Sequence, residues 1–114
     1  MSLRSKQSTF VFNISKLIQR AYSLGYELTF GEALRSQAQA DLNAASGAGI
    51  SNSLHLQKLA IDLNLFKDGK YLSASADHAE LGAYWKTLDP ENRWGGDFRK
   101  PDGNHYSMTH NGVS

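Results

Sequence analysis

The fold and the candidate site of this chain are best predicted from one segment, Ser53–Phe66, SLHLQKLAIDLNLF. In its second half, aliphatic and polar residues alternate one for one: Ile61, Asp62, Leu63, Asn64 and Leu65. Successive side chains of a strand point to opposite faces, so this pattern predicts a strand over Ala60–Phe66 with one apolar and one polar face. The carboxylate of Asp62 then points away from the core, toward whatever the polar face lines.

Working outward from that strand, two histidines and a second acid complete a possible metal site. His55 precedes Asp62 by seven residues, and Asp102 precedes His105 by three. Imidazole nitrogen and carboxylate oxygen are both ligand types that zinc accepts. His55, Asp62 and His105 would supply three ligands and Asp102 a general base, which is the inventory of a catalytic zinc site with one open position.

The segments Ser53–Asp62, Trp94–Asp97 and Asp102–His105 together resemble the M15 family of zinc peptidases. That family includes D-alanyl-D-alanine carboxypeptidases and dipeptidases, and L-alanyl-D-glutamate peptidase endolysins of bacteriophages. Its pattern reads S-x-H-x-x-G-x-A-x-D, followed by [ED]-x-x-H. The resemblance runs from about Tyr26 to Tyr106, and four positions of the first motif match: Ser53, His55, Ala60 and Asp62. Two positions depart from the usual pattern, with Lys58 in place of glycine and Asp102 where many members have glutamate.

The resemblance implies a role for each site residue. His55, Asp62 and His105 would hold Zn²⁺, and Asp102 would act as general base. Arg35 matches the family arginine that binds a substrate carboxylate or the developing oxyanion, tasks that suit guanidinium geometry. Ser53 and Gln37 are candidate substrate contacts.

Simpler interpretations of the same residues stay open. Asp62 could form a salt bridge to Arg35 or Lys58, and Arg35 could be a solvated surface residue. Asp102 lies in Pro101-Asp102-Gly103, which is also good turn chemistry, and Asp97 is a rival acid. Trp94 could wall the site or stack on substrate, and the glycines after it would allow close backbone approach. The remaining histidines match no motif and are predicted to lie on the surface: His78 and His110.

Composition limits the class of protein. A length of 114 residues predicts one domain, residues 1–114, and a net charge of +1 gives no argument for nucleic acid binding. The chain has no cysteine, so a zinc site must use histidine and carboxylate. No apolar run approaches the roughly 20 residues of a membrane span, and the polar N-terminus does not resemble a signal peptide.

The hydrophobic pattern predicts a small α+β domain with a mainly antiparallel sheet, helices packed on one side and the zinc on the other. The resemblance implies the fold shared by DD-peptidases and hedgehog domains. An amphipathic helix of about 15 residues should begin near Phe10, and a short helix should begin after Arg35. A third helix with its cap at Asp77 should end before Pro90, and 91–104 should be a loop. The predicted strands are Tyr26–Phe30, Ala60–Phe66, Lys70–Leu72 after an Asp68-Gly69 turn, and His105–Met108.

From the motifs and the resemblance together, we expect a monomeric zinc peptidase that cuts peptidoglycan stem peptides. The resemblance suggests a phage or prophage endolysin of the L-alanyl-D-glutamate type, made in the bacterial host cytoplasm without a signal peptide and acting at the cell wall. Two alternatives stay open: a D-Ala-D-Ala carboxypeptidase or dipeptidase with the same site, and a non-catalytic zinc- or wall-binding module.

Overall fold

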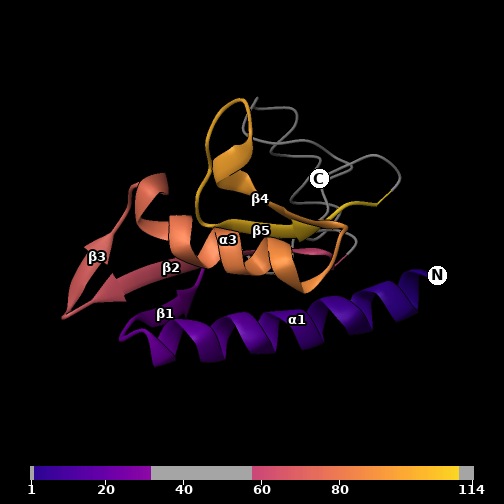
Figure 1. Cartoon of the computed structure of the whole chain (residues 1–114), viewed down its shortest axis with the longest axis horizontal. Coiled ribbons are helices and arrows are strands. Elements are labelled where there is room, and N and C mark those ends of the chain that lie inside the picture. Colours follow the sequence, from indigo (N-terminus) through magenta and orange to yellow (C-terminus); the bar gives the residue numbers. More distant parts are fainter. Residues whose placement is uncertain (1, 32–57, 111–114) are drawn as a thin grey trace.

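The structure is a computed structural model that describes residues 2–31 and 58–110 (Figure 1). The short helix expected after Arg35 and four predicted site residues lie outside these ranges: Arg35, Gln37, Ser53 and His55. The described elements are α1 (Leu3–Ser23), β1 (Glu27–Phe30), β2 (Ala60–Lys67), β3 (Lys70–Leu72), the 3₁₀ helix η1 (Ser75–His78), α3 (Ala79–Leu88), β4 (Asn92–Trp94), the 3₁₀ helix η2 (Gly95–Asp97) and β5 (His105–Met108). Within these ranges, neither α-helix has the length and apolar character needed to cross a bilayer.

Helix α1 starts about two turns earlier than its hydrophobic pattern predicts. Ser2 caps it, since the Ser2 side chain accepts a hydrogen bond from the backbone N–H of Ser5 at 3.1 Å. The first turns are polar and lie mostly at the surface, so they carry no apolar period. Later turns bury one stripe at steps of four, three and four residues: Phe10, Ile14, Leu17 and Ala21. The helix ends before Gly25, whose φ of +88° suits glycine, as predicted.

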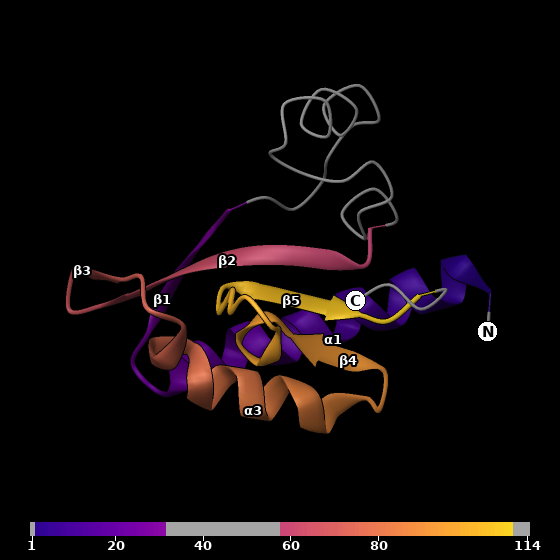
Figure 2. The same cartoon turned by 90° about the horizontal axis from the view of Figure 1, so that it is seen from above.

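The strands form one antiparallel sheet in the order β1-β2-β5-β4, with β3 also paired to β2. Figure 2 shows β2, β5 and β4 side by side, with α3 running next to β4 on the side away from β2. The β2–β3 turn has φ of +53° at Asp68 and +78° at Gly69, the left-handed pair that an Asp-Gly hairpin turn requires. The predicted alternation of β2 and its hairpin are therefore confirmed.

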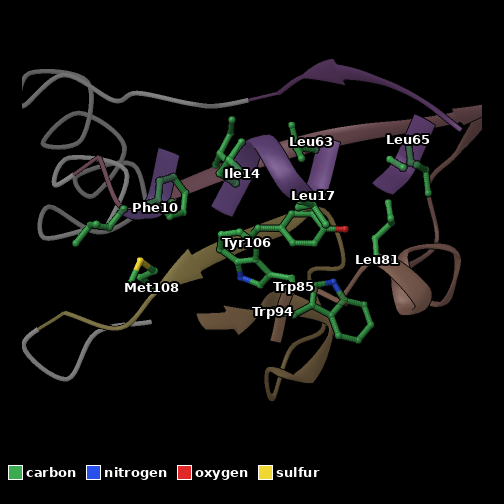
Figure 3. Close-up of a cluster of buried hydrophobic side chains, with 14 residues drawn as sticks. Phe10, Ile14, Leu17, Leu63, Leu65, Leu81, Trp85, Trp94, Tyr106 and Met108 are labelled. Carbon is green, nitrogen blue, oxygen red and sulfur yellow. The ribbon is translucent and has the colours of Figure 1, made fainter. Parts of the chain in front are cut away.

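One face of the sheet carries the core, shown in Figure 3. The Trp85 ring of α3 makes edge-on contacts with Phe10 of α1 at 5.7 Å and with Tyr106 of β5 at 6.1 Å, measured between ring centroids. Both helices therefore cover the face that bears Tyr106 and its cross-strand partner Ile61. This confirms the predicted α+β class with helices on one side, and it leaves Asp62 and His105 on the opposite face.

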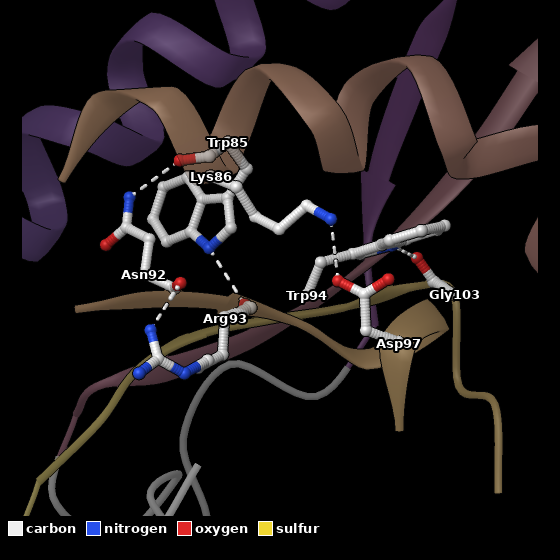
Figure 4. Close-up of polar contacts among 7 residues, drawn as sticks. All are labelled: Trp85, Lys86, Asn92, Arg93, Trp94, Asp97 and Gly103. Carbon is white, nitrogen blue, oxygen red and sulfur yellow. Dashed lines mark hydrogen bonds and ion pairs between the residues drawn. The ribbon is translucent and has the colours of Figure 1, made fainter. Parts of the chain in front are cut away.

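The loop predicted for residues 91–104 is wrong in part, because β4 and η2 lie within it. The three residues of β4 are too few to show an alternating pattern. Side-chain hydrogen bonds in both directions between α3 and β4 hold the strand in place (Figure 4). The Trp85 Nε1–H donates to the Arg93 carbonyl at 2.9 Å, and Asn92 Nδ2 donates to the Trp85 carbonyl at 2.9 Å.

The predicted cap at Asp77 is also displaced. Its carboxylate accepts from the backbone N–H of Ala74 at 3.2 Å and so stabilises the 3₁₀ turn η1, not the first turn of α3. The N-cap of α3 is His78, which makes no side-chain capping bond. A short 3₁₀ segment ahead of the α-helix therefore takes Asp77, the cap that the sequence spacing assigned to α3.

The prediction that His78 lies on the surface is wrong. His78 is 2% exposed, and its Nδ1 lies 2.8 Å from the Tyr106 hydroxyl. Burial lowers the pKa of His78 below its usual 6.5, while the nearby Asp77 charge opposes the shift. Burial also raises the pKa of Tyr106, so its hydroxyl stays protonated. The two groups form a neutral polar pair inside the core, and a lone histidine in the sequence carries no signal for this.

The buried His78 predicts a loss of stability in acid. Because its pKa is depressed in the folded state, the unfolded chain takes up a proton first as the pH falls below about 6.5. The contribution of neutral His78 to the free energy of unfolding is intact above pH 6.5 and is lost as the pH falls below it. Thermal melts between pH 7.5 and 5.0 should show wild type losing more stability than His78→Gln, which can hydrogen-bond but does not titrate. Parallel losses in both proteins would contradict this.

Candidate metal and catalytic site

The polar face of the sheet brings Asp62, Asp102 and His105 together. Each offers one possible ligand atom, and the three atoms all lie within 4.8 Å of one another. The Oδ1 atom of Asp62 is 3.4 Å from Nδ1 of His105, and the two side chains are 19% and 12% exposed. Two carboxylates and one imidazole this close together form a compact donor set at the edge of solvent.

Strand pairing explains how Asp62 meets His105. The two residues are direct cross-strand partners in the β2–β5 ladder, so their side chains emerge on the same face at adjacent positions. The register is held beside them, where the Leu63 N–H donates to the Asn104 carbonyl at 2.9 Å. On the β1 side, the Gly31 N–H donates to the Asp62 carbonyl at 2.8 Å. A one-residue slip of β2 against β5 would turn Asp62 into the apolar core and leave His105 behind, so burial of the apolar face also fixes the site.

Asp102 reaches the same place from the turn that precedes β5. Its N–H donates to the Gly95 carbonyl at 2.8 Å, and its own carbonyl accepts from the His105 N–H at 3.1 Å. A Cβ on Gly95 would collide with the Asp102 carbonyl and lie 2.8 Å from the His105 Cβ. The close backbone approach predicted for this glycine is confirmed. Asp102 is thus a turn residue whose side chain also belongs to the cluster.

Trp94 lies beneath the site and not in it. It is 8% exposed, and its ring faces Gly82 and Gly96, where any added Cβ would overlap the indole. Its Nε1–H donates to the Gly103 carbonyl at 2.7 Å (Figure 4). The possibility that Trp94 stacks on substrate is therefore wrong for the described structure, because the ring supports the turn that carries Asp102.

Asp97 and Phe98, which are neighbours in sequence, lie differently relative to the three-residue cluster. The rival acid Asp97 pairs with Lys86, Nζ to Oδ2, at 2.8 Å (Figure 4), and it is not part of the three-residue cluster. Phe98 packs its ring against His105 at 5.4 Å between centroids. Phe98 was not among the predicted site residues, since an aromatic residue after Trp94–Asp97 has no signature of its own.

Lys58, the departure from the family pattern, is exposed and has a φ of +58°. Glycine adopts this left-handed conformation freely, whereas other residues incur about 1 kcal/mol or more. The free energy of unfolding of Lys58→Gly, measured in urea, should therefore lie within about 1 kcal/mol of the wild-type value. Relief of backbone strain in the folded state offsets the greater entropy of the unfolded chain. Lys58→Val should be less stable than wild type by about 1–2 kcal/mol, since a β-branched residue tolerates this region poorly. Equal stabilities for the glycine and valine variants would contradict this account of the position.

Comparison with known proteins bears on the motif directly. The family model for M15 peptidases described as D-alanyl-D-alanine carboxypeptidase matches residues 46–108, more than half of the chain. The chain belongs to the M15 peptidases. The predicted family resemblance is thereby confirmed.

A solved structure supports the same fold for this M15 peptidase. The chain is similar to the crystal structure of the Serratia marcescens L-Ala D-Glu endopeptidase ChiX, with a TM-score of 0.73 and 22% sequence identity. The match covers 88% of this chain and 77% of that one. No curated protein sequence matches the chain.

The donor chemistry of the cluster fits a metal ion. Nitrogen and carboxylate oxygen suit zinc, and the described residues offer them at one point on the sheet face. Asp62 and His105 come from paired strands, so their relative positions are fixed before any ion binds. Asp102 is held by its backbone and is exposed, which suits either a third ligand or a neighbouring base.

Proposed function

We propose that this M15 peptidase is a zinc-dependent hydrolase of bacterial peptidoglycan stem peptides. The observation that carries the proposal is the Asp62, Asp102 and His105 cluster on the polar face of the sheet. Asp62 and His105 would bind zinc together with His55, which lies outside the described residues. Bound zinc would polarise a carbonyl and lower the pKa of a water molecule.

The chain's own residues would then move the proton. Asp102 is close enough to Asp62 and His105 to face a water at the same point. Its carboxylate would take a proton from the attacking water and pass it to the leaving amine, a role that needs hydrogen-bonding reach more than burial. Phe98, whose ring packs on His105, would limit the rotation of that imidazole.

Substrate charge would be met by residues before the strand. We propose that Arg35 pairs with a substrate carboxylate or the developing oxyanion, and that Ser53 and Gln37 contact the peptide. These assignments rest on the family motif, because none of the three residues lies in the described ranges.

The bond that is cut is the finer part of the proposal. The structural neighbour is named as an L-Ala D-Glu endopeptidase, and this favours the bond between L-alanine and D-glutamate. The description of the family model favours a D-Ala-D-Ala carboxypeptidase as the second candidate. We also propose that the protein acts at the bacterial cell wall as a monomer, as a phage or prophage endolysin would.

Digestion of purified peptidoglycan separates these candidates. We expect fragments whose masses and new amino termini place the cut after L-alanine, and no release with a chelator until zinc is restored. Release of free D-alanine alone would indicate the carboxypeptidase. Zinc binding without any released fragment would indicate a non-catalytic binding module. Full hydrolysis in excess chelator would overturn the metal-dependent mechanism.

A further inference from the structure

We propose that Ser75 and Trp94 are positioning residues that fix the general base Asp102 by holding the backbone of Gly103. The inference rests on the proposed function, since it assigns these residues to the proton-transfer step. Neither residue contacts the three-residue cluster through its own functional group, and each would act through the turn.

The two residues hold Gly103 through both of its peptide groups. The Gly103 N–H donates to Ser75 Oγ at 3.0 Å, and the Gly103 carbonyl accepts from Trp94 Nε1 at 2.7 Å. The backbones touch as well, because a Cβ on Gly103 would lie 2.5 Å from Ser75 Cα. The peptide plane before Gly103 is therefore held by η1, through Ser75, and the peptide plane after it is held by β4, through Trp94.

The preceding peptide groups are also bonded, so the restraint is continuous. The Asp102 N–H donates to Gly95 and the Asp102 carbonyl accepts from His105. With the Ser75 and Trp94 bonds, four successive backbone groups of Asp102 and Gly103 each have a partner. Asp102 itself is exposed, so side-chain packing does not hold it in place. Its position relative to Asp62 and His105 comes from the backbone.

Of these contacts, the Ser75 hydroxyl can be removed with the least change elsewhere. It lies in η1, 28 residues from Gly103, and a side-chain oxygen accepts the bond. A substitution of Trp94 should destabilise the fold more, because its ring fills the space that Gly82 and Gly96 leave by having no Cβ. A misplacement of about 1 Å can lower a rate about 100-fold, so loss of one backbone restraint should slow proton transfer.

The test is a double-mutant cycle between Ser75 and Asp102 in the zinc-loaded protein. We expect Ser75→Ala to lower kcat about tenfold, with KM within about twofold and zinc content unchanged. Ser75→Thr keeps the hydroxyl and should recover most of the rate. In the Asp102→Asn background, Ser75→Ala should change the residual rate less than about twofold, because its target is already gone. Ser73→Ala, at an exposed serine two residues earlier, is the matched control and should behave as wild type.

The outcomes separate this inference from the proposed function. Equal effects of Ser75→Ala with and without Asp102 would make Ser75 a general structural residue and overturn the inference, as would a wild-type kcat in Ser75→Ala. If Ser75→Ala does not fold, Trp94→Phe, which removes the indole N–H, takes its place in the same cycle and is judged by the same criterion. No hydrolysis by the wild-type protein would instead overturn the proposed function, and the inference with it.

Discussion

His105→Ala is expected to lose bound zinc and hydrolysis together. The imidazole is 12% exposed and shares its site with Asp62, so its removal takes one nitrogen donor from the cluster and leaves a carboxylate facing the gap. Without the metal, nothing lowers the pKa of the attacking water, and hydrolysis should fall by more than about 10³-fold. Zinc measured by mass spectrometry of the dialysed protein should drop from about one per chain to background.

The matched control for this variant is His110→Ala, at a histidine that is not part of the cluster. It should retain both zinc and activity. Melting curves should show His105→Ala still folded, because the core lies on the opposite face of the sheet. Retention of a full equivalent of zinc by folded His105→Ala would remove His105 from the ligand set.

Asp102→Asn is expected to separate catalysis from binding. Asparagine keeps the shape of the side chain and the backbone bonds to Gly95 and His105, but it cannot accept a proton at neutral pH. General-base catalysis contributes about 10²–10⁴-fold, so hydrolysis should fall by about two orders of magnitude or more while zinc is retained. The comparison variant is Asp97→Asn, which loses only an exposed pair with Lys86 and should keep nearly full activity.

The assignment of Asp102 has two ways to fail. Near-normal hydrolysis by Asp102→Asn would reduce Asp102 to a turn residue. Loss of zinc would make it a ligand, which its 4.8 Å proximity to Asp62 and His105 allows, and the proton-transfer role would then need another group.

Much of the fold could be predicted because its key segments alternate strongly. The β2 pattern, the Asp68-Gly69 turn and the α1 stripe all reflect burial of one face, which the sequence records directly. The misses have different causes. The first turns of α1 are polar, and β4 has only three residues. His78 is buried with a hydrogen bond to Tyr106, and no local sequence pattern indicates this contact.

The candidate site also has a part that could be predicted from the sequence and a part that could not. Asp62, Asp102 and His105 could be predicted because their chemistry and spacing form a motif, and the structure brings them together. The support beneath them could not, because it consists of backbone groups of Gly95 and Gly103 and of the space that glycine leaves. Arg35, Gln37, Ser53 and His55 stay predictions of the motif alone.

The central claim is that Asp62 and His105 hold a zinc ion beside Asp102, and anomalous diffraction from zinc-loaded crystals at the zinc absorption edge tests it most directly. We expect one anomalous peak on the polar face of the β2–β5 pair, with an Asp62 oxygen and a His105 nitrogen at roughly 2.0–2.2 Å. The Asp102 carboxylate should lie near the ion but beyond that distance. A peak elsewhere on the protein, or none at saturating zinc, would show that Asp62 and His105 do not bind the metal.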